Sequence, residues 1–394
     1  MENIRAIQGN KRIRPGMHLL VAAYGLACLW LYYHQSVAAL PDQAIIPYQS
    51  DLPLHISMIV EDGWYYSFTA YAYKALHMLF GGSTVGIALL LALASVGAVY
   101  VTEEAICYFG TFQSKNGGTL AMALASNLVM PIYLEYAGVY RYVSFQSPNV
   151  WHNSTYVCMK LLALMTFLYY FKLETKYREG ISVKEWLVFA LLNAVTTGIK
   201  PSFLLAFSPI MGLFLLWDLF HKVPFKRIFI FGSAMLPSGL VVLWQNMVLF
   251  GADTGNGMAI KPWYTFSLHA DRPKIAVLLS AAFCALVIVC TLGKVFHNKQ
   301  YLFVVLMAGL SFMEALCLVE QGSRAVDGNF LWGYSFGLFI LFIYTLIQCL
   351  KLERRTLWQK ILFWTLMAVY AMHLYAGTQF FLRLVCGESY WMKW

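Results

Sequence analysis

The feature that most restricts this chain is a recurrence of apolar runs, each about 20 residues long, from one end to the other. A helix of about 20 apolar residues is what crosses roughly 30 Å of lipid hydrocarbon. Apolar residues make up 60% of the 394 residues and charged residues only 12%, whereas about 25% of a soluble domain is charged. The sequence therefore predicts an all-α, polytopic bundle of membrane-spanning helices, with residues 1–394 forming a single transmembrane domain.

About eleven spanning helices are predicted, and their breaks have chemical causes. Pro201 lacks an amide donor and disfavours helix at Lys200, so a break is expected there. The polar stretch "HKVPFKR" makes another. The predicted spans are about 17–38, 84–102, 119–137, 154–172, 184–199, 202–220, 228–250, 275–293, 301–319, 330–350 and 359–380.

The distribution of basic residues predicts the orientation of the chain. If the N-terminus is cytoplasmic, most of the 28 Lys and Arg residues fall on the inner side, as the positive-inside rule requires. The C-terminus is then outside. The net charge of +9 is explained by loops that face anionic lipid, so no nucleic-acid partner is expected.

The first outer loop, 39–83, is unusually rich in apolar residues. Its segment "ISMIVEDGWYYSFTAYAYKALHMLFGG" is interrupted by Glu61 and Asp62. This pattern favours one or two helices that lie in the membrane interface. The alternative is a further spanning helix, which would invert every later loop.

Polar and aromatic residues gather in the outer loops and at the outer ends of the predicted helices. These residues are Asp51, His55, Glu61, Asp62, Arg141, His152, Asn153, Lys200, Glu320, Arg324, Asn329 and Trp332. Lys160 lies about six residues, or about 9 Å, below the outer end of its predicted helix. Ionisable groups at such depth usually face a cavity inside the protein, although Lys160 and Lys200 could also extend to the interface.

These residue types suit one class of ligand. Cations just below the outer interface can bind a phosphate, a carboxylate above them can act as a general base, and Trp rings offer flat faces to sugars. A sugar carried on a lipid phosphate fits all three. Asp51 has an alternative role as a helix N-cap, because Pro53 follows it. No HExxH pattern occurs, and a divalent cation stays an open option.

The chain resembles the GT-C class of integral-membrane glycosyltransferases, in particular bacterial enzymes of cell-surface polysaccharide. The resemblance is carried by "SDLPLH" with the amphipathic segment after it, "SPNVWHNST", "GIKPSF" and "GNFLWGY". It implies a polyprenyl-phosphate-linked sugar donor and transfer with inversion on the outer face of a bacterial plasma membrane. Asp51 matches the position of the acidic residue of the class, although this chain has one acidic residue where the class often has two.

The sequence thus favours a glycosyltransferase, or a polymerase, of envelope glycan that uses a glycan or lipid acceptor. Asp51, with His55, is expected to deprotonate the acceptor, and Glu61 and Asp62 stay open as alternatives. Lys200 and Arg324, with Lys160 behind them, are expected to bind the leaving lipid phosphate. His152 and Asn153 would orient sugar hydroxyls. A flippase for a lipid-linked glycan and a non-catalytic scaffold are the other hypotheses.

Overall fold

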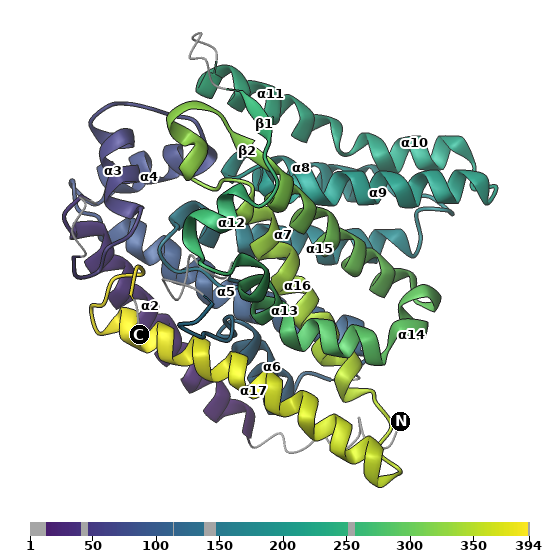
Figure 1. Ribbon diagram of the computed structural model, residues 1–394. Coiled ribbons are helices and arrows are strands. Elements are labelled where there is room, and N and C mark those ends of the chain that lie inside the picture. Colours follow the sequence, from purple (N-terminus) through teal and green to yellow (C-terminus); the bar gives the residue numbers. More distant parts are fainter. Residues whose placement is uncertain (1–12, 41–45, 113, 138–146, 251–256, 393–394) are drawn as a thin grey trace.

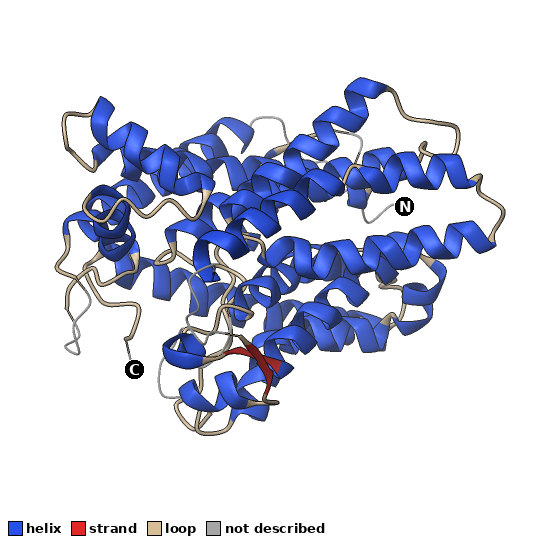
Figure 2. Cartoon of the chain, turned by 90° about the horizontal axis from the view of Figure 1, so that it is seen from above, coloured by secondary structure: helices blue, strands red, loops and turns tan. Residues whose placement is uncertain are grey.

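The computed structural model describes residues 13–40, 46–112, 114–137, 147–250 and 257–392. Nearly all regular structure in these ranges is helical (Figures 1 and 2). The strands β1 (Met258–Ile260) and β2 (Leu318–Glu320) form one short antiparallel pair. The prediction of an all-α protein is confirmed.

The helices follow the apolar runs closely. In the first half they are α2 (Ile13–Val37), α3 (Leu52–Val60), α4 (Phe68–Leu79), α5 (Val85–Gly110), α6 (Gly117–Ser126), α7 (Ser154–Glu174), α8 (Val183–Ile199) and α9 (Ser202–Phe220). In the second half they are α10 (Phe225–Ser233), α11 (Leu236–Phe250), α12 (Tyr264–His269), α13 (Pro273–Cys290), α14 (Leu292–His297), α15 (Lys299–Cys317), the 3₁₀ turn η2 (Gly322–Val326), α16 (Leu331–Leu350) and α17 (Leu357–Val385).

Within the described ranges, nine helical segments are long and apolar enough to cross a membrane, and α10 and α11 together count as one of them. The chain is therefore a polytopic helical membrane protein. The predicted break at Lys200-Pro201 lies between α8 and α9, and "HKVPFKR" separates α9 from α10, as expected. The segment 46–83, most of the predicted first loop, contains two short helices, α3 and α4.

Two of the eleven predicted spans are not among these nine. The span predicted at 184–199 forms α8, which has 17 residues and is shorter than the nine. The span predicted at 119–137 is wrong as a continuous helix. Helix α6 ends at Ser126 after 10 residues, which cover only about 15 Å.

The chain continues beyond α6 as a non-helical stretch, 128–137, whose first part, 129–131, is buried and whose residues 134–136 are exposed. The side-chain amide of Asn149 donates to the carbonyls of Ser126 and Val129 and so satisfies the open end of the helix. Pro131 then prevents the helix from resuming. The break is thus held by a side chain that comes from beyond the predicted span.

Helix α17 fixes this non-helical stretch in place. The amide of Met130 donates to the carbonyl of His373, and the imidazole Nδ1 of His373 lies 2.7 Å from the carbonyl oxygen of Met130. Gly377 lets the backbone of Leu128 approach so closely that a Cβ at this position would overlap the Leu128 carbonyl oxygen. Non-helical backbone at membrane depth requires such partners, because hydrocarbon offers none.

Helix α16 forms the centre of the bundle. Every residue of α16 except Leu350 is buried. Helices α5, α9, α13 and α15 pack around it, and α2 and α17 lie side by side at the edge of the molecule (Figure 1). A helix that is apolar on all sides is expected in such a central place.

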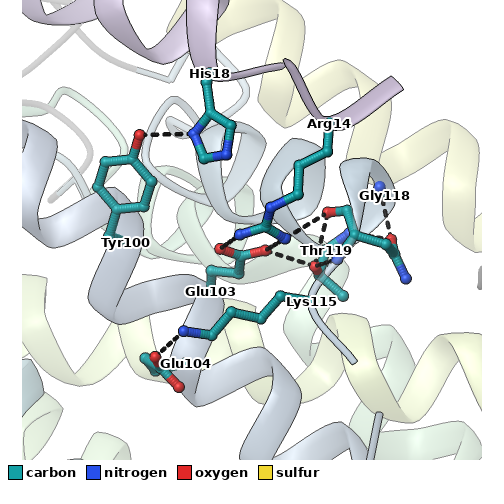
Figure 3. A network of polar contacts seen from close by, with 9 residues as sticks. Arg14, His18, Tyr100, Glu103, Glu104, Lys115, Gly118 and Thr119 are labelled. Carbon is teal, nitrogen blue, oxygen red and sulfur yellow. Dashed lines mark hydrogen bonds and ion pairs between the residues drawn. The ribbon is translucent and has the colours of Figure 1, made fainter. Parts of the chain in front are cut away.

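A polar cluster joins α2, α5 and α6 at the end opposite the first loop. Figure 3 shows the guanidinium of Arg14 facing the carboxylate of Glu103, with two nitrogen–oxygen distances of 2.9 and 3.2 Å. The hydroxyl of Thr119 donates to the same carboxylate at 2.7 Å. Glu103 is almost completely buried, so this bidentate ion pair is a structural link between three helices.

Candidate functional site

Three segments that are distant in the sequence meet around Asp51. The side-chain amide of Asn153 donates to the carboxylate Oδ2 of Asp51 at 2.8 Å, and the amide of Asp51 donates to the carbonyl of His152. The ammonium of Lys200 lies 3.1 Å from the hydroxyl of Thr155 and 3.5 Å from Oδ1 of Asn153. Asn153 therefore connects the candidate base to the candidate cation.

Aromatic rings form one side of this group. The Lys200 ammonium lies 4.8 Å from the centre of the Trp332 ring, at the start of α16. The imidazole of His152 stacks on the ring of Tyr390, with centroids 4.0 Å apart and an angle of 2° between the planes. The ring centroids of Trp332 and His152 are 6.0 Å apart. An ammonium over the face of a buried indole makes a favourable cation–π contact, which holds Lys200 beside Trp332.

A second polar cluster comes from the segment between β2 and α16. Glu320 accepts hydrogen bonds from Arg324 at 3.1 Å and from Asn329 at 2.6 Å. Arg324 also lies 3.7 Å from Asp327. The charges of Arg324 and Glu320 both act on Lys200, so the two clusters share one electrostatic environment.

Burial alters the proton affinities of the central pair. Burial raises the pKa of Asp51 to about 6, although the hydrogen bond from Asn153 and the charge of Lys200 lower it. Burial lowers the pKa of Lys200 to about 8, and the carboxylate of Asp51 opposes this shift. Near neutral pH, Asp51 is thus mostly an anion with unusual basicity while Lys200 is still a cation. This is the state that a general base beside an anion-binding site needs.

The two histidines of the site are kept neutral. Burial, together with the charge of Lys200, lowers the pKa of His55 to about 4 and that of His152 to about 3. Nδ1 of His55 lies 3.1 Å from the hydroxyl of Ser154. Both rings can therefore take part in hydrogen bonds with a bound molecule, but neither supplies a positive charge at neutral pH.

The local sequence explains how these side chains are held. Asn153 is the N-cap of α7, where its Oδ1 accepts from the amide of Tyr156 at 3.0 Å while its amide group reaches Asp51. Asp51 occupies the N-cap position of α3, as predicted, but its side chain makes no capping hydrogen bond. The predicted N-cap position of Asp51 is thus confirmed, but its carboxylate accepts a hydrogen bond from Asn153 of α7 instead of capping α3.

Most of the residues predicted for the site are brought together, and the others are not. Glu61 and Asp62 lie at the far end of α3, about 15 Å from Asp51 along the helix, and both are exposed. Glu61 accepts a hydrogen bond from Ser57 there. Arg141 lies outside the described residues. These placements leave Asp51 as the carboxylate nearest to Lys200 on the first loop.

Lys160 does not reach Asp51 but bonds elsewhere. Its ammonium donates to the side-chain oxygens of Asn127 and Asn149, at 2.9 Å for Asn127, and lies 3.8 Å from the centre of the Phe339 ring. Asn127 also donates to Thr102. Lys160 is thus buried, as its depth predicted, and it supports the end of α6 rather than extending to the interface.

Sequence reasoning missed the contribution of the C-terminal segment. Tyr390 is buried against His152, and burial, together with the charge of Asp51, raises the pKa of its hydroxyl. The hydroxyl of Ser389 donates to Oε1 of Gln49 at 2.7 Å, and the amide of Tyr48 donates to the carbonyl of Gly387. The aromatic composition of "CGESYWMKW" was the available signal, but nothing in it indicates a partner.

Metal ligands and known relatives give no further assignment. Among the residues that the structure describes, no group of three or more His, Cys, Asp or Glu side chains is placed to hold a metal ion. No protein-family model matches the chain, and no curated protein matches it. The function is therefore argued from the geometry of the site.

Proposed function

We propose that this protein is a membrane glycosyltransferase of the GT-C class that moves a sugar from a polyprenyl-phosphate-linked donor to a cell-envelope acceptor. The observation that carries the proposal is the junction of Asp51, Asn153 and Lys200 beside the ring of Trp332. A base of raised pKa, a cation and an aromatic face lie within one small region. Together they match an acceptor hydroxyl, a lipid phosphate and a sugar ring.

In the proposed reaction, Asp51 removes the proton from a hydroxyl of the acceptor. The acceptor oxygen forms a bond to the anomeric carbon as the bond from that carbon to the phosphate oxygen breaks. The configuration at carbon is inverted, and the proton stays on the Asp51 carboxyl. Lys200, with Arg324 near it, stabilises the charge that develops on the leaving polyprenyl phosphate. The neutral rings of His152 and His55 form hydrogen bonds with sugar hydroxyls, as donors through N–H or as acceptors through the other ring nitrogen.

The proposal includes an orientation. The N-terminus is cytoplasmic, the C-terminus is outside, and the site faces the outer side of a bacterial plasma membrane. Helices α3 and α4 then lie in the outer interface, where a lipid-linked sugar and its glycan or lipid acceptor can meet. The basic residues of the inner loops support this orientation.

Transfer by the purified protein tests the proposal. The protein in nanodiscs is incubated with radiolabelled polyprenyl-phosphate sugars and candidate acceptors. Asp51→Asn keeps the size of the side chain but removes the base, so transfer is expected to fall to the background rate. Glu61→Gln is the matched control, because it removes an exposed carboxylate at the other end of the same helix and should leave transfer unchanged. Near-normal transfer by Asp51→Asn would remove Asp51 from the mechanism. The length of the product separates a transferase from a polymerase.

The interrupted helix α6 favours a second candidate, a flippase for a lipid-linked glycan. Transporters often bind their substrates where spanning helices are broken, and the break after Ser126 lies close to the buried ammonium of Lys160. Translocation of a fluorescent lipid-linked glycan across proteoliposomes tests this candidate. Translocation without transfer would favour the flippase, whereas transfer without translocation would favour the enzyme.

A further inference from the structure

A groove of about 470 Å³ lies between the non-helical stretch after α6 and helix α17. One wall is the stretch Met130–Leu134, and the other is the face of α17 from Ala368 to Phe380. The groove exists because α6 stops early and because the facing positions Ala368, Ala371 and Ala376 carry small side chains. It is separate from the group around Asp51 and Lys200.

The lining of this groove is mostly apolar, apart from Gln379 and the hydroxyl groups of its tyrosines, and it opens toward the lipid. Met372 and Tyr375 at its edge are 51% and 65% exposed on the surface of a spanning helix, so they face hydrocarbon. An apolar cavity does not retain water. The natural occupant of an open, apolar groove at this depth is therefore a hydrocarbon chain.

The length of the groove indicates what kind of chain it takes. The thirteen residues from Ala368 to Phe380 span about 18 Å along the axis of α17. The hydrocarbon of one leaflet is about 15 Å deep, half of the roughly 30 Å core. The groove thus fits a single acyl chain that descends through one leaflet.

Buried rings separate the groove from the candidate site. Phe380, at the end of the groove, packs on Trp151 with ring centroids 6.2 Å apart, and Phe381 packs on the same ring at 5.2 Å. Trp151 is buried, and its indole donates to the hydroxyl of Tyr24. A lipid whose phosphate must reach Lys200 would have to cross these rings, which favours an ordinary bilayer lipid over the sugar donor.

We propose that this groove binds one acyl chain of a bilayer phospholipid, which fills the space beside the non-helical stretch and supports it. The binding site does not depend on the proposed glycosyltransferase activity. Filling the groove with a chain replaces contacts that a continuous helix would otherwise make against α17. The lipid is then a structural partner of the stretch that follows α6.

Photolabelling in a bilayer tests this proposal. The full chain is reconstituted in vesicles of phosphatidylethanolamine and phosphatidylglycerol that contain a trace of phospholipid with a diazirine on one acyl chain. After illumination, adducts are expected to concentrate on the peptides that contain 130–134 and 368–380. In Ala371→Trp, whose side chain fills the groove, these adducts are expected to be lost. Leu382→Trp, on the exposed surface of α17 beyond the groove, is the matched control and should keep them.

Two outcomes would overturn the proposal. One is an equal yield of adducts along the whole exposed face of α17, with no loss in Ala371→Trp. The other is labelling of the groove only by a diazirine-bearing polyprenyl phosphate in a parallel reconstitution, which would assign the groove to that lipid instead. Ala368→Phe fills the same space from an exposed position and replaces Ala371→Trp if the latter does not fold.

Discussion

The rings of His152 and Tyr390 lie parallel and 4.0 Å apart, and this contact joins the last segment of the chain to the start of α7. His152 also provides the carbonyl that accepts from the amide of Asp51. The C-terminal segment therefore helps to position the backbone that carries the candidate base.

Removal of the Tyr390 ring is expected to slow transfer. A stacked pair of this kind contributes about 0.5–1.5 kcal/mol, which corresponds to a reduction of roughly twofold to tenfold in Tyr390→Ala. Tyr390→Phe keeps the ring and should keep the rate. Initial transfer rates of the three proteins at equal folded concentration check this, and an unchanged rate in Tyr390→Ala would show that the stack has no role in the reaction.

The pH dependence of transfer is expected to be bell-shaped. Below a pH of about 6 Asp51 gains a proton and no longer acts as a base, and above about 8 Lys200 loses its proton and its charge. Rates measured from pH 5 to 10 test both limbs. Lys200→Arg keeps a cation over this whole range, so its rate should not decline through pH 8. A decline in that variant equal to the wild-type decline would exclude Lys200 as its cause.

Glu103 and its neighbour Glu104 are expected to differ sharply in their contribution to stability. Glu103 is buried and pairs with the partly exposed Arg14, and the loss of one partner from a fully buried pair, the upper limit here, costs about 3–5 kcal/mol. Glu104 pairs with Lys115 at the surface, where a pair contributes about 0–1 kcal/mol. Thermal unfolding of Glu103→Gln and Glu104→Gln in detergent should show a large fall in the midpoint only for the first. Equal midpoints would contradict the structural role of the Arg14–Glu103 pair.

Lys160→Met is expected to lower stability rather than remove a substrate contact. The change leaves the side-chain oxygens of Asn127 and Asn149 without their donor, at a cost of about 1–3 kcal/mol for each buried group. Lys184→Met, at an exposed position in the first turn of helix α8, is the control. If Lys160→Met unfolds at the wild-type temperature but fails to transfer, then the sequence-based interpretation of Lys160 as a phosphate ligand is the better one.

Gly377→Ala is expected to be strongly destabilising, because its Cβ would overlap the carbonyl oxygen of Leu128. Backbone atoms cannot move aside as a flexible side chain can. Gly309→Ala is a suitable comparison, since Gly309 also lies within a helix but a Cβ there meets no atom within 4 Å. Gly309→Ala should stabilise the folded protein by up to about 1 kcal/mol, because alanine has a higher helix propensity than glycine. Unfolding midpoints that shift in the same direction would argue against the close approach at Leu128.

The sequence was sufficient for features with local causes. Runs of apolar residues predicted the helices, and Pro201 predicted the boundary between α8 and α9. Asp51, Lys200 and Trp332 could be proposed for one site because loops on the same side of a bundle lie at the same level. The bonds of Asp51 and Lys200 to Asn153 could not be predicted, since they depend on how α3, α7 and the end of α8 are placed.

The features that were missed depend on contacts between distant segments. Apolar composition continues through 127–137, so its pattern is that of a helix, whereas Asn149 and His373 satisfy a non-helical backbone there. The role of Asp51 as a cap was a sound local interpretation, but Asn153 binds its carboxylate instead. In both cases a tertiary hydrogen bond outweighs a local preference.

The non-helical stretch after α6 has a consequence for the order in which the protein is made. Its backbone depends on His373 and Gly377 of α17, and His373 lies 243 positions after Met130 in the chain. Before α17 is inserted, those amide and carbonyl groups cannot be satisfied by lipid. The stretch after α6 therefore matures only once α17 is in place, and nascent chains that stop short of α17 are expected to be substrates for membrane quality-control proteases.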